Sequence, residues 1–118
     1  MKDRPRSAPE RWAELLFGDF AGMPGWSDRQ QGWFSVMVSG TALLLLLSEQ
    51  GTIERVTRTV KHVIAEARAG RLAAREATRR VRPSELFSPE EDAAIQRNGR
   101  QYGWALKDFP MNPGRRSA

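Results

Sequence analysis

The sequence contains no cysteine, and this absence excludes several kinds of site at once. Without thiolates the chain forms no disulfide, has no cysteine nucleophile and builds no cysteine-ligated zinc or iron–sulfur centre. His62 is the only histidine, so one chain cannot build a multi-histidine metal site or a haem site with two histidine ligands. The segment 22–25 contains two glycines but lacks the Lys-Ser or Lys-Thr of a phosphate-binding loop. These absences predict a protein that is not an enzyme and binds no cofactor or metal.

Charged residues are also absent from one long window, 30–48, although they make up 28% of the chain. At about 1.5 Å per residue, a helix of this length spans roughly 28 Å, close to the hydrocarbon thickness of a bilayer. The strictly apolar part, 33–47, is shorter and lies between the lengths typical of a membrane span and of a buried core helix. The window therefore predicts either a single membrane span or the central buried helix of a bundle.

The residues around this window favour the membrane interpretation. Trp12, Trp26 and Trp33 precede the window or lie near its start, where interfacial aromatic anchors belong. The surplus of basic residues follows the window, so the positive-inside rule predicts a cytoplasmic carboxyl terminus. We therefore expect a single-pass membrane protein, and the alternative is a soluble cytoplasmic protein.

Small residues within the window form a second pattern. Ser35, Ser39 and Gly40 lie close to one another along a helix and provide a surface that another helix can approach closely. Small residues also fill tight positions in any buried helix. The pattern predicts helix packing at these three residues and leaves open whether the neighbouring helix belongs to a partner.

Capping signals predict where the first two helices begin. The sequences Ser-Ala-Pro-Glu at 7–10 and Ser-Asp-Arg-Gln at 27–30 are both capping-box patterns. They predict a short amphipathic helix over 8–17 and a central helix over 28–50. The short helix either lies in the headgroup region of a membrane or faces the core of a small bundle.

Further helices are predicted after the apolar window. Thr52 is a candidate cap for a third helix, and a helical stretch over 72–81 precedes Pro83, which is expected to stop it. Ser88 begins another capping pattern that predicts a helix over 89–101. The acidic residues in its first turn favour the helix dipole, and this role explains them better than a catalytic or metal-binding one.

A dense set of basic residues follows the apolar window and could contact a polyanion. Near a bilayer these side chains would contact anionic headgroups, whereas in a soluble protein they would suit the phosphates of nucleic acid. The third interpretation is an ordinary solvated helix face. The nine residues are Arg55, Arg58, Lys61, Arg68, Arg71, Arg75, Arg79, Arg80 and Arg82.

Aromatic residues near the carboxyl end are candidate anchors for a partner protein. Tyr102, Trp104 and Phe109 lie among glycines and prolines, in a stretch too irregular to form a core alone. Packing against the chain's own third helix is the simpler alternative.

Together these patterns predict an all-α protein with four regions: an interfacial segment at 1–26, the apolar helix at 27–51, a basic helical region at 52–104 and an extended tail at 105–118. The leading hypothesis is a non-enzymatic, single-span accessory or structural subunit of a larger membrane-associated assembly. Its partners would be other protein subunits and a bilayer with anionic headgroups. The alternative is a soluble four-helix module whose basic face binds nucleic acid or a protein.

Overall fold

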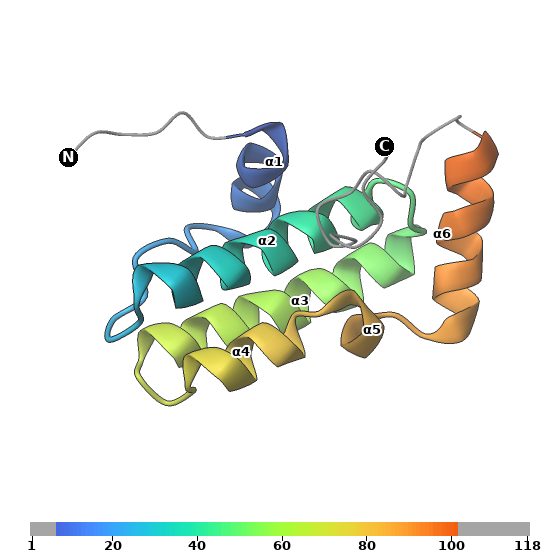
Figure 1. Cartoon of the computed structure of the whole chain (residues 1–118). Coiled ribbons are helices and arrows are strands. Elements are labelled where there is room, and N and C mark those ends of the chain that lie inside the picture. The colour runs from blue at the N-terminus through green and yellow to red at the C-terminus, as the bar shows by residue number, and fades with distance from the viewer. Residues whose placement is uncertain (1–6, 102–118) are drawn as a thin grey trace.

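The computed structural model describes residues 7–101, and over this range the chain is helical with no strand. This confirms the all-α fold class. Figure 1 shows the helices, which are α1 (Ala8–Phe17), α2 (Asp28–Leu45), α3 (Gln50–Arg68), α4 (Ala74–Arg80), α5 (Pro83–Leu86) and α6 (Pro89–Gln101).

The helices predicted from capping boxes begin where the sequence indicates. At α1, Ser7 Oγ accepts a hydrogen bond from the Glu10 amide at 3.3 Å, while the Glu10 carboxylate accepts from the Ser7 amide at 2.9 Å. The same reciprocal arrangement precedes α2 and α6. The bounds predicted for α1 and α6 and the start predicted for α2 are therefore confirmed.

The end predicted for the central helix is wrong, because α2 ends at Leu45 rather than at residue 50. The amides of Leu46 and Leu47 donate to carbonyls three residues back, at 3.1 and 3.0 Å, and this tightens the last turn. Ser48 Oγ then donates to the Leu44 carbonyl at 3.0 Å. The last two leucines of the run therefore lie in the turn between α2 and α3, and they do not extend one straight helix.

Two other predicted boundaries also change. Thr52 lies inside α3 and donates to the Glu91 carboxylate instead of capping the helix. The helix predicted over 72–81 is the shorter α4. Pro83 does follow its end, but it also begins α5, since proline is well suited to the first position of a helix.

The membrane span predicted over 27–51 receives no support from the structure. Within residues 7–101, no helix combines the length and the apolar character that crossing a bilayer requires. The physical reason is visible in α2, whose first four residues, 28–31, are polar and whose 18 residues end before the leucine run does.

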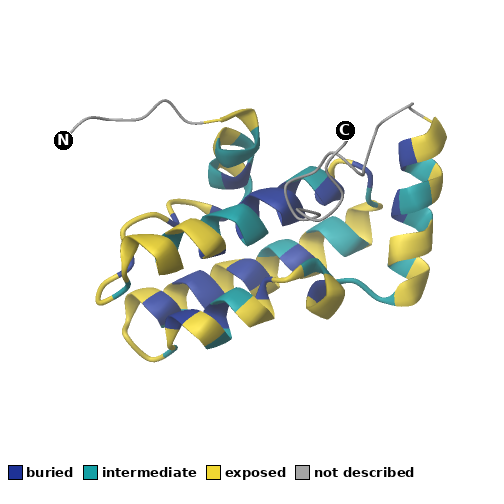
Figure 2. Ribbon diagram, in the orientation of Figure 1, coloured by how far each residue is buried: buried dark blue, intermediate teal, exposed yellow. Residues whose placement is uncertain are grey.

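The three central helices lie side by side. Figure 1 shows that α2 and α4 run in the same direction, that α3 runs antiparallel to both, and that α6 stands across the end where α2 turns into α3. Figure 2 shows buried residues along the inward faces of these helices and exposed residues on their outer faces. In this arrangement α2 contacts α1 as well as α4.

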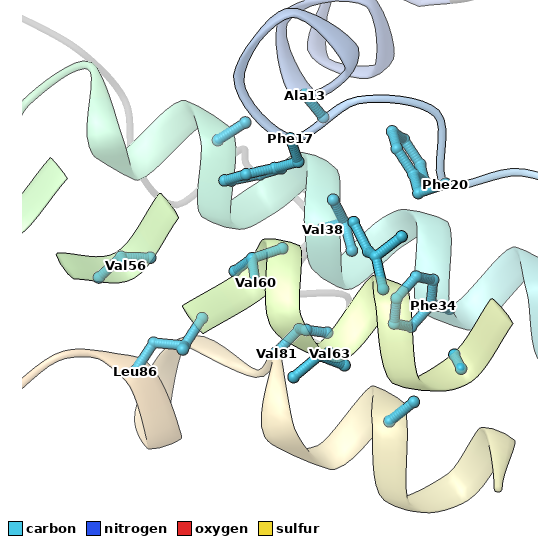
Figure 3. Packing of buried hydrophobic residues seen from close by; sticks show 14 of the residues in the cluster. Ala13, Phe17, Phe20, Phe34, Val38, Val56, Val60, Val63, Val81 and Leu86 are labelled. Atoms are coloured by element: carbon cyan, nitrogen blue, oxygen red, sulfur yellow. The ribbon is translucent and has the colours of Figure 1, made fainter. Parts of the chain in front are cut away.

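The main core collects apolar side chains from α1 to α5. Figure 3 shows side chains of α1, α2, α3 and the segment after α4 converging between the helices. Its large members with no more than 2% exposure include Phe34, Val38, Leu45, Val56, Val60, Val63 and Val81. A smaller second cluster joins Leu44 and Leu47 at the α2–α3 corner to Ile95 of α6.

The segment between α1 and α2 is hydrogen-bonded to side chains of α2 and α3. The Gln31 side chain donates to the Phe20 carbonyl at 2.7 Å and accepts from the Met23 amide at 3.0 Å. Arg68 of α3 donates to the carbonyls of Asp19 and Ala21 at 3.0 and 2.8 Å. These bonds hold α1 and its connection against the α2–α3 pair.

Candidate functional site

A groove of about 500 Å³ lies between α2 and α4. The two helices run in the same direction, and each contributes side chains at helical spacing to the lining of the groove. The lining residues are Gln30, Trp33 and Met37 on α2, with Ala74, Arg75, Thr78 and Arg82 on and just after α4.

The α2 wall of the groove is apolar. Trp33 leaves 49% of its surface exposed, although its neighbour Phe34 is completely buried in the core. Met37, one turn further along, is partly buried and packs against the same core. On the opposite wall Ala74 is buried and short, and Thr78 is half-buried, so neither fills the space between the helices. The groove thus presents an indole and a thioether on a fixed helix.

The other wall carries two positive charges. Arg75 and Arg82 are exposed, and within residues 7–101 neither makes an ion pair or a side-chain hydrogen bond. Arg82 lies two residues after the end of α4, and the helical rise places its α-carbon roughly 10 Å from that of Arg75. None of the seven lining residues is acidic, so the groove contains no carboxylate to neutralise these guanidinium groups.

Most of the other basic residues predicted to contact a polyanion are bonded within the fold. Arg55 donates to the Leu86 carbonyl and pairs with Glu91, and Arg68 bonds to the segment before α2. Arg71 pairs with Glu66.

Arg79 and Arg80 also form ion pairs within the fold. Both pair with Glu76, at 2.6 and 2.9 Å, and Arg79 also pairs with Glu85 at 3.2 Å. Their hydrogen bonds lower the pKa of Glu76 to about 2. Of the nine predicted residues, Arg58, Lys61, Arg75 and Arg82 make no side-chain bond within the described range. The two on α3, Arg58 and Lys61, are exposed there, away from the lining of the groove.

The predicted interfacial tryptophans have different environments. Only Trp33 contributes to the groove, whereas Trp12 and Trp26 are partly buried against the core. The Trp26 ring meets Phe34 edge to face, with centroids 5.1 Å apart. Trp12 has a buried indole N–H with no hydrogen-bond partner.

All three predicted helix-packing residues lie against other parts of the chain itself. Ser35 Oγ donates to the Glu10 carboxylate of α1 at 3.4 Å. Ser39 and Gly40 are buried, and the Ser39 hydroxyl has no hydrogen-bond partner. The predicted partner anchors Tyr102, Trp104 and Phe109, and the tail at 105–118, lie outside the described residues.

Four lining residues, Gln30, Met37, Ala74 and Thr78, were not predicted from the sequence. A signal existed at α4, where the spacing of residues 74, 75 and 78, with 82 just after the helix, combines short side chains with cations on one side. The contribution of α2 had no local signal, because it depends on which helix lies beside α4.

No cluster of histidine and carboxylate side chains that could hold a metal occurs in the part of the chain that the structure describes. Comparison with known proteins found no protein-family model, no curated protein and no solved structure that matches the chain.

Proposed function

We propose that the protein is a non-enzymatic binding module that serves as an accessory subunit of a larger protein assembly. The α2–α4 groove is the surface that holds a segment of the partner. The observation that carries this proposal is the half-exposed Trp33, which lines the same groove as two arginines that have no acidic partner in the described fold.

The residue types of the groove support protein binding. Tryptophan and arginine are enriched among the residues that dominate binding energy at protein interfaces, and methionine adapts its shape to different partners. Uncompensated charge beside an apolar surface adds selectivity and speeds association with a partner of opposite charge. Trp33, Met37 and the two arginines provide all three properties on helices held by a common core.

The same composition favours binding over acid–base catalysis. The lining side chains are an amide, an indole, a thioether, a methyl, a hydroxyl and two guanidiniums. None of these groups is an imidazole, a carboxylate or an amine, the side chains that usually act as general bases. The groove can therefore hold an anionic or apolar group, but its side chains offer no general base.

The bonds that the other basic residues form within the chain weigh against the nucleic-acid alternative. Five of the nine basic residues already bond to carboxylates or carbonyls of the same chain. Each would have to give up an internal partner before it could neutralise a phosphate.

Peptide selection on the purified full chain tests the proposed function. A random peptide library is panned against the wild type, against Trp33→Ala, and against the control Leu15→Ala. Leu15 is 78% exposed on α1 and does not line the groove, so its truncation removes a comparable exposed apolar group elsewhere.

We expect the wild type and Leu15→Ala to enrich the same sequences and Trp33→Ala to lose them. Circular dichroism establishes that both variants are folded. Enrichment of the same peptides by Trp33→Ala, or of no peptide by the wild type, would overturn the proposal.

A further inference from the structure

The spacing of the two free arginines limits the shape of the partner segment. Arg75 lies on α4 and Arg82 two residues after its end, both on the same side of the groove, and the helical rise places their α-carbons roughly 10 Å apart. Thr78, the lining residue between them on the same wall, has a short side chain and leaves room for a partner between the two arginines. A partner that satisfies both arginines needs two negative groups on one face at about this separation.

The opposite wall specifies what lies between the negative groups. Trp33 and Met37 are four residues apart and form one apolar surface on α2. At one end, Gln30 uses its Oε1 to accept from the Ser27 amide at 2.8 Å, which leaves its amide N–H groups as donors. The groove therefore offers donors and cations around an apolar centre, and its charged groups include no acceptor.

An α-helix matches this spacing more closely than an extended strand does. On a helix, residues i and i+7 lie on one face about 10.5 Å apart, with i+3 and i+4 between them on that face. On a strand, about 10 Å separates residues i and i+3, which point to opposite sides. A helical segment therefore places two acidic residues at about this separation on one face, with an apolar side chain between them on that same face.

We propose that the groove binds an amphipathic helix of a partner protein, which carries acidic residues at i and i+7 and an apolar anchor at i+3 or i+4. The acidic residues pair with Arg75 and Arg82, and the anchor packs against Trp33 and Met37. This inference rests on the proposed function and adds the conformation and the residue pattern of the partner.

Designed peptides test the inference with the full chain. The first is a fifteen-residue helical peptide of alanine and glutamine, with glutamates at its fourth and eleventh positions and a leucine at its eighth. The second moves the later glutamate to the ninth position, which turns it to another face. The third places a proline beside the leucine to prevent the helix. Fluorescence anisotropy of the labelled peptides measures affinity.

We expect the first peptide to bind about tenfold more tightly than the other two. The double variant Arg75→Glu with Arg82→Glu should lose about tenfold for the first peptide, and a peptide with lysines in place of both glutamates should recover it. The matched control is Arg58→Glu with Lys61→Glu, which changes net charge equally on α3 and should leave affinity within about twofold.

Equal binding of all three peptides, equal effects of the two double variants, or no binding of the first peptide would each overturn the inference. The proposed function fails separately. If library selection still enriches peptides that depend on Trp33 while these helical peptides bind equally or not at all, the groove remains a binding site and only the helical pattern is wrong.

Discussion

Thr41 and Val81 are joined by a hydrogen bond in the interior of the protein. The Thr41 hydroxyl donates to the Val81 carbonyl at 3.1 Å, and both residues are completely buried. The bond links α2 to the point where α4 ends, so it also helps to fix the two walls of the groove relative to each other.

Thr41→Val tests this link. Valine keeps the shape of threonine but removes the donor, so a buried carbonyl loses its partner. We expect the free energy of unfolding to fall by about 1–3 kcal/mol, measured by urea denaturation. An unchanged unfolding midpoint would show that the bond contributes nothing to the fold.

Ser39→Ala is expected to have a different effect at a neighbouring buried position. The Ser39 hydroxyl is buried without a partner, so its removal eliminates a desolvated polar atom and breaks no bond. Stability should stay constant or rise by up to about 1 kcal/mol in the same urea titration. A loss as large as that of Thr41→Val would contradict this account.

Adjacent residues on α2 should differ greatly in their tolerance of truncation. Phe34→Ala removes a fully buried ring and should cost about 3–5 kcal/mol, much of the stability of a typical small domain. Trp33→Ala removes a half-exposed ring and should cost about 1 kcal/mol or less. Thermal unfolding followed by circular dichroism compares the two, and similar melting temperatures would mean that the faces of α2 are wrongly assigned.

Glu91 is expected to make stability depend on pH. Its carboxylate accepts hydrogen bonds from the Ser88 amide, which has the largest effect, and from the side chains of Arg55 and Thr52. These bonds lower its pKa below 4.5. The stabilisation is therefore complete above the unfolded-state pKa of about 4.5 and is lost as the pH falls through the lowered folded-state pKa. Glu91→Gln should lower the free energy of unfolding by about 1 kcal/mol at pH 7, with a difference from wild type that shrinks towards pH 3.

Urea midpoints at pH 7, 5 and 3 provide the measurement. Glu90→Gln is the matched control, since Glu90 is exposed in the same helical turn and its side chain forms no bond within residues 7–101. A difference between wild type and Glu91→Gln that stays constant down to pH 3 would show that ionisation of Glu91 is not the cause.

Two glycines should respond oppositely to alanine. Gly70 follows α3 with φ of 76°, a conformation that strains any residue with a Cβ, so Gly70→Ala should cost about 1 kcal/mol. Gly32 lies in α2 and has open space where the Cβ of an alanine would lie, so Gly32→Ala should add about 0.5–1 kcal/mol. Chemical denaturation distinguishes the signs, and destabilisation by both substitutions would contradict the assignment.

Local signals predicted the parts of the fold that depend on neighbouring residues. The capping boxes at Ser7, Ser27 and Ser88 involve atoms three residues apart, so their sequence pattern is sufficient to locate three helix starts. The end of α2 has no comparable signal. Its leucines turn towards Ile95, about fifty positions later in the chain, and a hydropathy pattern does not contain that contact.

The groove illustrates the same limit. The sequence marks Trp33 and Phe34 as equally apolar, and the packing of α2 in the fold decides which of them stays exposed. The basic residues also look alike in the sequence. Arg55 is committed to Glu91, thirty-six positions away, whereas Arg75 keeps a free charge. These distinctions come from tertiary contacts, so the candidate site could be predicted only as a set of cations.

The attachment of α6 divides the molecule into units of unequal stability. This helix buries Ile95 and Gly99, and it is joined to the α2–α3 corner through the small leucine cluster, the Asn98 bond to the Leu47 carbonyl and the contacts of Glu91. Detaching it exposes much less apolar surface than separating α3 from the main core. The amide hydrogens of α6 should therefore exchange with solvent when this helix alone detaches. Those of α3 should exchange only when the whole domain unfolds.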